Sequence, residues 1–333
     1  MLRKVVIASL SVLLFLLLAS GAYVYTLINQ TSQALVENGD TQVTDPQTTN
    51  SEDPSTDSPF QDYAVEGIEN ILILGLDRRL DDDVPRSDAI MIATVDNKND
   101  SLKLTSLMRD MYVAIPGHRN NKLNSAFAFG GVELATETIN YNFHLNIERY
   151  VTLDFNAFEG IIDAIGGVTI EVSSAEVRAI NRNLNNRPGA NVSNLNSYAL
   201  NSAGVQTLNG RQALAYARIR DVGNNDFERV ERQQKVLSVL FEEVQSLSPL
   251  RFPALLSTIL PHVETNFTAF ELLSKGTTVL GFNDKQIHRF RLPVDGAYSS
   301  QTIRGGASAL VPDLEKNRQL LHEFLNTDPT VTE

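Results

Sequence analysis

Arginine and aspartate occur together where apolar runs of the sequence end or begin. Asp77 and Arg79 follow one short apolar run, and Arg86 and Asp88 directly precede the next one. If the two runs form neighbouring strands, the carboxylates of Asp77 and Asp88 lie close together. Two facing carboxylates suit a hard cation such as Mg²⁺, which usually completes its shell with waters and substrate phosphate oxygens. The alternative is that both are turn residues in a polar loop, beside the three aspartates at 81–83.

A second pair, Arg109-Asp110, directly follows a run that predicts a strand ending near Leu107. Two interpretations stay open for this arginine. It is either a surface residue paired with its neighbour or a residue that reaches an anion at the end of the sheet.

A third group lies at the start of the longest predicted helix, over residues 227–244. Arg229, Arg232 and Gln233 stand at positions i, i+3 and i+4, which share one face of a helix. The helix N-terminus adds free backbone N–H groups and the positive end of the dipole. Cations there oppose the dipole, so stability alone does not explain them, whereas anion binding does. The alternative is a solvated face on which the arginines pair with neighbouring glutamates.

Arginine is concentrated at the predicted ends of helices and strands. The seven residues are Arg79, Arg86, Arg109, Arg218, Arg220, Arg229 and Arg232. Guanidinium groups bind phosphate oxygens in a bidentate manner and stay charged. A substrate with several phosphoryl groups, together with a divalent metal ion, is the most economical explanation.

The composition excludes several other kinds of site. The 333 residues include no cysteine, which rules out disulfides, thiolate zinc sites, iron–sulfur clusters and thiol nucleophiles. The five histidines form no HExxH pair, and the GxSxG, GxxxxGK[ST] and SxxK motifs are absent too. A net charge of −12 makes nucleic acid a poor partner.

The elements that must position these residues predict one α/β domain with a mixed central sheet flanked by helices. Its first strand, over residues 71–75, is wholly apolar, as expected of a strand buried on both faces. Strands and helices intermix without a regular βαβ repeat. The predicted strands are 71–75, 89–95, 102–107, 112–115, 150–153, 168–172 and 287–292, and the predicted helices are 132–143, 155–165, 212–217, 227–244, 255–260, 270–280 and 315–325.

Residues 1–29 predict a cytoplasmic tip and a transmembrane signal anchor. Val5 to Ala22 is almost uninterrupted apolar sequence, and with the residues that follow it the stretch exceeds 20 residues, enough to span a bilayer. Arg3 and Lys4 place the N-terminus in the cytoplasm. The alternative is a cleaved signal peptide, since small residues occupy positions 19–22. Both interpretations export the rest of the chain from the cytoplasm.

Residues 30–66 predict a disordered, extended linker. Eight acidic residues and no basic ones fall between positions 31 and 66, among many Ser, Thr, Asn, Gln and Pro residues. Such a run cannot bury enough apolar surface to offset its ordering entropy. Because the linker carries −8 and the N-terminal tip +2, the predicted domain over 67–333 carries only −6. Most of the acidity therefore lies outside the folded part.

The arginine and aspartate motifs resemble those of the LytR-CpsA-Psr family. The likeness rests on the segments 75–79 and 86–88, on Arg109-Asp110, and on the longer segments 122–127, 208–220 and 226–234. They occur in the family's order between residues 70 and 244, and the anchor, linker and exported domain resemble its layout as well. Residues 246–333 carry no motif of this kind.

The resemblance implies a phosphotransferase of the bacterial cell envelope. Such an enzyme moves a glycopolymer, either teichoic acid or a capsule-type polysaccharide, from a polyprenyl-pyrophosphate carrier to peptidoglycan and leaves a phosphodiester link. Asp77 and Asp88 would hold Mg²⁺ or Mn²⁺, and an apolar tunnel through the core would accept the prenyl chain. The pyrophosphate-binding residues would be Arg79, Arg86, Arg109, Arg218, Arg220, Arg229, Arg232 and Gln233.

This chemistry agrees with the residue types. Phosphoryl transfer depends on charge neutralisation and in-line positioning, which arginines such as Arg109 supply. Asp226 or Asp110 is the candidate general base, on position alone. Three other functions stay open: a polyprenyl-pyrophosphate hydrolase that uses the same site, a non-catalytic lipid-binding protein, and a transcription regulator.

Overall fold

The structure is a computed structural model that describes Phe60 and residues 63–77, 86–185, 198–223, 225–246, 255, 257, 259–303 and 306–328. The predicted anchor and nearly all of the predicted linker lie outside these residues. In the described part of the chain, no helix is long and apolar enough to cross a membrane.

Within the described residues, six strands form a mixed sheet, which confirms the predicted α/β fold with a mixed central sheet. In spatial order the strands are β10 (Ile287–Leu292), β3 (Ser101–Leu107), β2 (Arg86–Asp96), β1 (Ile68–Asp77), β6 (Ile147–Asp154) and β9 (Val263–Thr265). β1 runs parallel to β6 and β10 parallel to β3, and the other neighbouring pairs are antiparallel.

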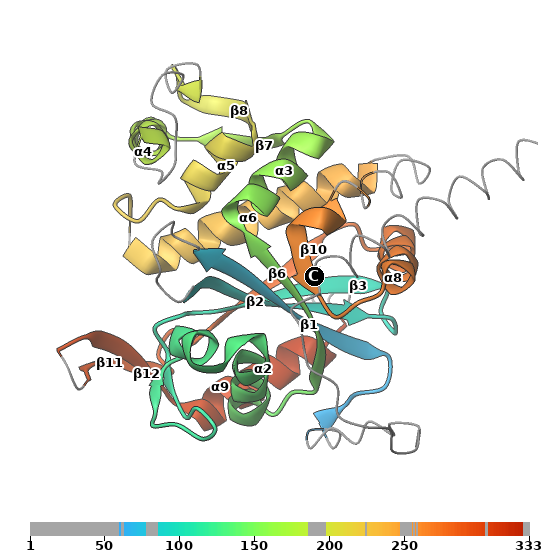
Figure 1. Cartoon of the computed structure of the whole chain (residues 1–333), viewed down its shortest axis with the longest axis vertical. Coiled ribbons are helices and arrows are strands. Elements are labelled where there is room, and N and C mark those ends of the chain that lie inside the picture. The colour runs from blue at the N-terminus through green and yellow to red at the C-terminus, as the bar shows by residue number, and fades with distance from the viewer. Residues whose placement is uncertain are drawn as a thin grey trace, which may run out of the picture.

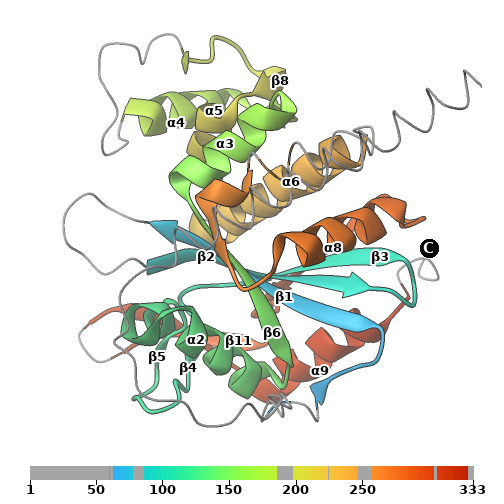
Figure 2. The same ribbon diagram turned by 45° about the vertical axis from the view of Figure 1, so that its right-hand side comes forward.

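Helices cover both faces of this sheet (Figures 1 and 2). One face carries α2 (Asn124–Phe143) and α9 (Leu314–Asn326). The other faces a layer of α3 (Phe155–Ile165), α4 (Ser174–Asn185), α5 (Gly210–Ala217) and α6 (Asn225–Ser246), with the strand pair β7 (Val168–Val172) and β8 (Gly204–Leu208). The remaining elements are α8 (Ala269–Gly281), the short helix η4 (Leu260–His262), the pair β4 (Tyr112–Val113) and β5 (Asn121–Lys122), and the hairpin of β11 (Tyr298–Thr302) and β12 (Ser308–Pro312).

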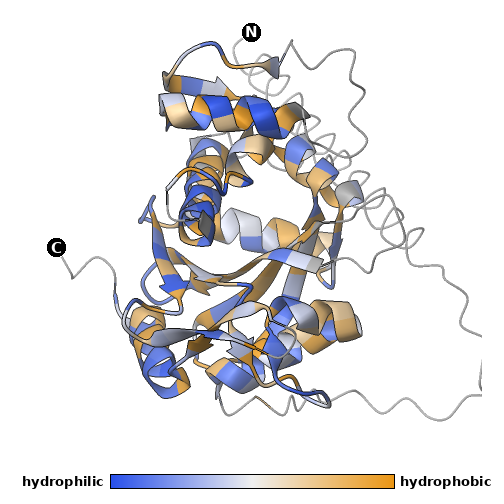
Figure 3. Ribbon diagram, turned by 90° about the vertical axis from the view of Figure 1, so that its left-hand side faces the viewer, coloured by the Kyte–Doolittle hydropathy of each residue, from blue (hydrophilic) through white to orange (hydrophobic). Residues whose placement is uncertain are grey.

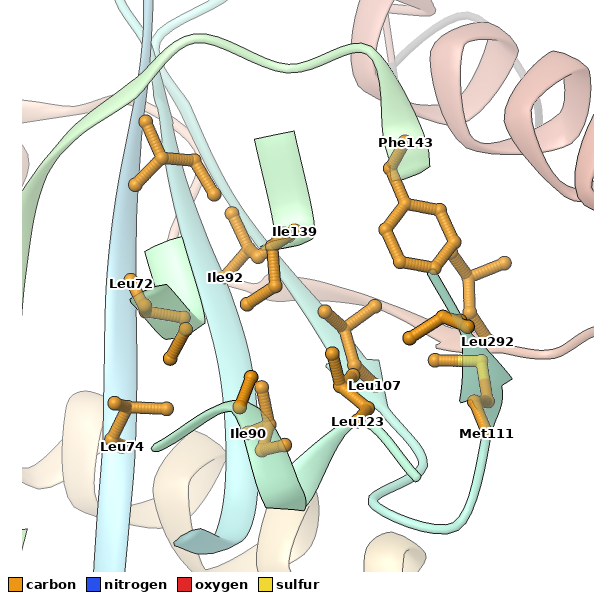
Figure 4. Packing of buried hydrophobic residues seen from close by; sticks show 14 of the residues in the cluster. Leu72, Leu74, Ile90, Ile92, Leu107, Met111, Leu123, Ile139, Phe143 and Leu292 are labelled. Carbon is orange, nitrogen blue, oxygen red and sulfur yellow. The ribbon is translucent and has the colours of Figure 1, made fainter. Parts of the chain in front are cut away.

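The main hydrophobic core fills the space between the sheet and α2. Leu72 and Leu74 of β1 are fully buried there, in one cluster with Ile139 and Phe143 of α2 (Figure 4). Side chains alternate along a strand, and Ile73 on the opposite face of β1 is only half-buried. The prediction that this strand is buried on both faces was therefore wrong, because its second face borders a cavity rather than a packed core.

The layer of α3 to α6 has a second core of its own. Ile162 of α3, Ile170 of β7, Ile180 of α4 and Tyr216 of α5 are buried in it. In Figure 3 the helices of this layer carry both hydrophobic and hydrophilic residues, as expected of helices that cover a core on one side. Helix α6 also joins the first core through Val230, so it connects the two cores.

The helix ends that frame the site follow from local sequence signals. The Asp154 side chain accepts a hydrogen bond from the backbone N–H of Ala157 at 2.8 Å and caps the start of α3, and Gly166 ends that helix in a left-handed conformation. Asn209 and Gln212 form a capping box at the start of α5. These caps confirm the predicted helix 155–165 and the predicted cap before the helix at 212–217.

Gly210 allows α5 to begin directly against α3. A Cβ atom at this position would lie 2.1 Å from the carbonyl oxygen of Glu159, a backbone atom that cannot swing away. We expect Gly210→Ala to lower the free energy of unfolding by about 2–3 kcal/mol, as overpacking does. Gly160→Ala is the control, because its Cβ meets nothing within 4 Å; in a helix this change should add about 0.5–1 kcal/mol. Urea unfolding measures both, and equal stabilities would contradict the close approach.

Candidate active site

The carboxyl end of β1 and the start of β2 meet in a β-bulge. Leu76 pairs with Ser87 and Gly75 with Ala89, so Asp88 is the extra residue on β2. A bulge redirects a side chain, and bulges are common next to active sites. Asp77, at the end of β1, pairs with Arg86, and its backbone thus lies on the neighbouring strand end, as the sequence predicts.

Three of the predicted site residues cannot be followed at side-chain level. Arg79 lies outside the described residues, and only the backbones of Asp77 and Arg86 are described. The described side chains of the site come from β2, from the loop after β3, from β5, from α4, and from the segment that contains α5 and α6.

Arg109 lies at the centre of a cluster of carboxylates. Its Nη1 donates to Asp88 Oδ1 at 2.5 Å, its Nη2 lies 3.7 Å from Asp226 Oδ2, and its Nε lies 3.6 Å from Asp110 Oδ2. The side chain is 17% exposed. Burial alone would lower the pKa of Arg109, but the charges of Asp88, Asp110 and Asp226 raise it. Arg109 therefore joins residues from three segments of the chain at one end of the sheet.

Asp110 has a second cationic partner. Lys122 Nζ donates to Asp110 Oδ1 at 2.7 Å. Burial would raise the pKa of Asp110, but the hydrogen bond from Lys122 and the charge of Arg109 lower it. Asp110 is thus held as a carboxylate at neutral pH. Lys122 belongs to the segment 122–127 that carried the family resemblance, but sequence reasoning gave it no role.

The start of α6 contributes an acid and a buried arginine to the same cluster. Asp226 Oδ1 lies 3.0 Å from Arg229 Nη1, and Arg220 lies 3.5 Å from Asp88 and 3.8 Å from Asp226. The Arg229 side chain is 4% exposed, and its Nε has no hydrogen-bond partner among the described residues. Burial, together with the charge of Arg109, lowers the pKa of Arg229 to about 10, so the group is still cationic at neutral pH. A buried guanidinium with spare donors is suited to bind an anion.

A cavity of about 450 Å³ adjoins this cluster. Its charged and polar lining residues include Asp88, Arg218, Arg220, Arg229 and Gln233. Its apolar lining comes from the second face of the sheet and from α3, α5 and α6, and includes Ile73, Ala89, Met91, Leu153, Phe155, Phe158, Leu214, Ala217 and Leu237. The cavity therefore offers an apolar compartment beside a group of guanidinium ions.

Comparisons with known proteins show the family to which the chain belongs. The model of the LytR_cpsA_psr family matches residues 24–323. The chain belongs to the LytR-CpsA-Psr family. It is 31% identical over 266 residues to regulatory protein MsrR of Staphylococcus aureus, which covers 79% of this chain and 76% of that protein. It is 28% identical over 249 residues to the polyisoprenyl-teichoic acid–peptidoglycan teichoic acid transferase TagV of Bacillus subtilis, over 73% of this chain and 61% of that protein.

Solved structures show the same LytR-CpsA-Psr fold. TagT bound to LIIa-WTA superposes with a TM-score of 0.65 at 24% identity, and the match covers 88% of this chain and 98% of that chain. This likeness shows the mixed sheet with helices on both faces, independently of the family motifs.

Among the arginines of the family motifs, Arg232 takes a different direction from its neighbours. Arg229 and Gln233 line the cavity, whereas Arg232 pairs with Glu176 and Glu228 at 3.0 Å each and donates to the carbonyl oxygen of Val222 at 2.9 Å. Successive helical residues are about 100° apart, so positions i+3 and i+4 diverge by the same angle. That angle is enough to turn Arg232 toward α4 and away from the cavity. Its contacts with Glu176, Glu228 and Val222 fix the turn between α5 and α6.

Sequence reasoning missed one charged pair that lines the cavity. Arg182 of α4 forms an ion pair with Asp221, the residue after Arg220. Both side chains are exposed. Neither residue stands in a motif or at a telling spacing, and α4 itself was not predicted, so the sequence offers no signal for the pair.

Proposed function

We propose that this LytR-CpsA-Psr protein transfers a glycopolymer of the teichoic acid or capsule type from a polyprenyl-pyrophosphate carrier to peptidoglycan. The observation that carries the proposal is the cluster around Arg109, which adjoins an apolar cavity edged by Arg218, Arg220 and Arg229. A pyrophosphate joined to a long apolar chain matches this site in two ways: its negative charge fits the guanidinium groups, and its chain fits the apolar lining of the cavity. In support, the related TagV is named a teichoic acid transferase, and TagT has been solved with bound octaprenyl pyrophosphate lipid.

The residues divide the work of binding and transfer. Guanidinium groups of Arg109, Arg220 and Arg229 neutralise the negative charge on the phosphoryl oxygens, and the burial of Arg109 and Arg229 strengthens their contacts. The prenyl chain occupies the apolar part of the cavity. An acceptor hydroxyl oxygen then bonds to the phosphorus that carries the glycopolymer, the bond from that phosphorus to the bridging oxygen breaks, and the lipid leaves as its monophosphate. The hydroxyl proton passes to a carboxylate, for which Asp226 and Asp110 are the candidates.

We propose that Asp77 and Asp88 hold a Mg²⁺ ion. In the described part of the chain no group of three or more His, Cys, Asp or Glu side chains could hold a metal ion. However, Mg²⁺ is commonly held by one or two carboxylates together with substrate phosphates. Asp88 on the bulge and Asp77 on the neighbouring strand end would supply these carboxylates. The ion would supply charge neutralisation on the phosphoryl oxygens.

Removal of divalent cations tests the metal proposal. We expect chelation by EDTA to lower the transfer rate by about 100-fold, and added Mg²⁺ to restore it. Isothermal titration of Mg²⁺ in the presence of inorganic pyrophosphate gives a readout besides activity. Asp88→Asn should weaken this binding, whereas Asp284→Asn, which removes a carboxylate on the loop before β10, should not. Binding that is unchanged in Asp88→Asn would refute the assignment.

We also place the domain outside the cytoplasmic membrane, behind the predicted anchor at Val5 to Ala22. A carrier lipid stays in the bilayer, so a tethered domain meets it without free diffusion. Protease added to intact cells should digest the domain, and protection of the domain would refute this placement.

The experiment that tests the function combines full-length protein, a polyprenyl-pyrophosphate-linked glycopolymer and peptidoglycan. We expect a phosphodiester-linked adduct and one lipid monophosphate for each transfer. Release of lipid monophosphate without an adduct would instead indicate a hydrolase that uses the same site. Lipid binding with neither product would indicate a non-catalytic lipid-binding protein.

A further inference from the structure

The direction of attack, which follows from the proposed function, locates the acceptor. In an in-line displacement the attacking oxygen approaches phosphorus from the side opposite the leaving group. Here the leaving group is a lipid monophosphate whose chain lies in the apolar cavity. The acceptor hydroxyl must therefore come from the side of the cluster that faces away from the cavity.

Arg109 marks the boundary between these two sides. Among the described residues, its partner Asp88 lines the cavity, whereas its other partners Asp110 and Asp226 do not. Lys122, the second partner of Asp110, is also absent from the lining. The two candidate general bases therefore lie on the outer side, where the acceptor oxygen has to arrive.

The β11–β12 hairpin adjoins both of these acids. The backbone N–H of Leu310 on β12 donates to the carbonyl oxygen of Asp110 at 3.0 Å. The Tyr298 ring on β11 stacks on Phe227, the residue after Asp226, with 5.8 Å between ring centroids. Arg291 supports Phe227 from another side, with its guanidinium 4.5 Å from the ring centroid. The base of the hairpin thus lies next to Asp110 and to the helix start that carries Asp226.

One face of this hairpin has the chemistry of a carbohydrate-binding surface. Tyr298 pairs with Pro312 and Ser300 with Leu310, so Tyr298 and Ser300 lie on the same face of β11, and Gln301 lies on the other. The strands β11 and β12 contain no charged residue. A half-exposed tyrosine can cover the apolar C–H face of a sugar ring, while its hydroxyl and that of Ser300 bond to sugar hydroxyls. Such a surface fits a neutral glycan better than a second anion.

We propose that the face of the β11–β12 hairpin that carries Tyr298 and Ser300 binds the acceptor glycan and directs one of its hydroxyl groups toward Asp110 and Asp226. The glycan lies along the hairpin and meets the donor phosphorus at the Arg109 cluster. The attacking oxygen loses its proton to one of the two carboxylates as its bond to phosphorus forms.

Two substitutions at adjacent positions test the surface with a matched control. Ser300→Arg puts a long side chain on the proposed face, and Gln301→Arg puts the same side chain on the opposite face of the same exposed strand. We expect Ser300→Arg to raise the KM for a soluble peptidoglycan oligosaccharide about ten-fold, and Gln301→Arg to leave it within about two-fold. Tyr298→Leu, which keeps an apolar contact with Phe227, should also raise this KM.

Affinity for the donor serves as an internal control, because the proposed surface binds only the acceptor. Affinity for the lipid-linked donor and melting temperature should stay at wild-type values in all three variants. An unchanged acceptor KM in Ser300→Arg and Tyr298→Leu would refute the assignment of this face as the acceptor-binding surface, even if the wild-type protein forms the adduct. An equal rise of the KM in Gln301→Arg would refute it as well. Failure of the wild-type protein to form any adduct would instead overturn the proposed function.

Discussion

Arg109→Ala is expected to lower the rate of glycopolymer transfer by about 1,000-fold, the upper range for loss of one electrostatic donor at a reacting centre. The arginine contacts Asp88, Asp110 and Asp226, so its removal leaves three carboxylates facing the site. Lys122, Arg220 and Arg229 still pair with these carboxylates, but the site has one cation fewer and would attract a pyrophosphate less strongly. Both kcat and donor affinity should therefore fall, and a radiolabelled lipid-linked donor measures the two separately.

Two further variants separate charge from geometry at this position. Arg109→Lys keeps the charge but cannot reach three carboxylates from one ammonium group, so we expect it to recover less than about a tenth of the activity. Arg289→Ala removes an exposed arginine from β10 and should leave activity unchanged. Activity of Arg109→Ala within ten-fold of wild type would exclude Arg109 from the reacting centre.

Among the substitutions considered, Lys103→Met is expected to lower the free energy of unfolding the most, by about 3–5 kcal/mol. This is the usual cost of removing one partner of a buried ion pair. The Lys103 side chain is 1% exposed, and its Nζ donates to Asp96 Oδ2 at 2.9 Å. It also donates to the carbonyl oxygens of Leu325 at 2.6 Å and Thr327 at 2.9 Å. One ammonium group thus joins β3 to the end of α9. Urea unfolding gives the loss directly.

The partner of Lys103 allows a double-variant test. In Lys103→Met the Asp96 carboxylate stays buried without its cation, and Asp96→Asn removes that charge. The double variant should therefore be more stable than Lys103→Met alone, whereas Lys98→Met, on the exposed turn nearby, should match wild type. Additive losses in the double variant would contradict a buried ion pair.

The same pair has a pH signature with a definite sign. Burial opposes ionisation of Asp96, but the hydrogen bonds from Lys103 and Asn99 prevail and lower the pKa of Asp96. A carboxyl group whose pKa is lower in the folded state contributes stability that is fully present above its unfolded pKa. This contribution is lost as the pH falls through the lowered value. Wild-type protein should therefore lose stability in acid more steeply than Asp96→Asn does.

Helices and strands with strong local signals were predicted closely from the sequence. The helix 155–165 and the strands 168–172 and 287–292 have the observed bounds of α3, β7 and β10. Their apolar periodicity and caps act within a few residues, so they need no knowledge of the fold. The missed elements α4, β8 and the β11–β12 hairpin have polar residues between their apolar ones, and the apolar residues of α4 and β8 pack into the second core with distant segments.

Part of the membership of the candidate site could be predicted, but not its internal arrangement. Strand ends and helix starts brought Asp88, Arg109 and Asp226 to one place, as their positions in the sequence suggested. The direction of Arg232 could not be predicted, because it depends on Glu176 of a helix that the sequence did not indicate. The role of Lys122 depends likewise on the pairing of β4 with β5, which sets its distance from Asp110.

The cavity between the sheet and the helices α3, α5 and α6 makes its occupant part of the protein's own interior. Ile73 and Met91 of the sheet and Phe158 of α3 line a space that no side chain fills completely. A prenyl chain bound there would pack between the sheet and the helices as core side chains do, so the substrate would supply part of the hydrophobic core. Because a ligand that binds only the folded state adds stability in proportion to the logarithm of its concentration, the melting temperature becomes a measure of carrier lipid supply. In each catalytic cycle the lipid monophosphate would leave this part of the core, and the chain of the next donor would occupy it.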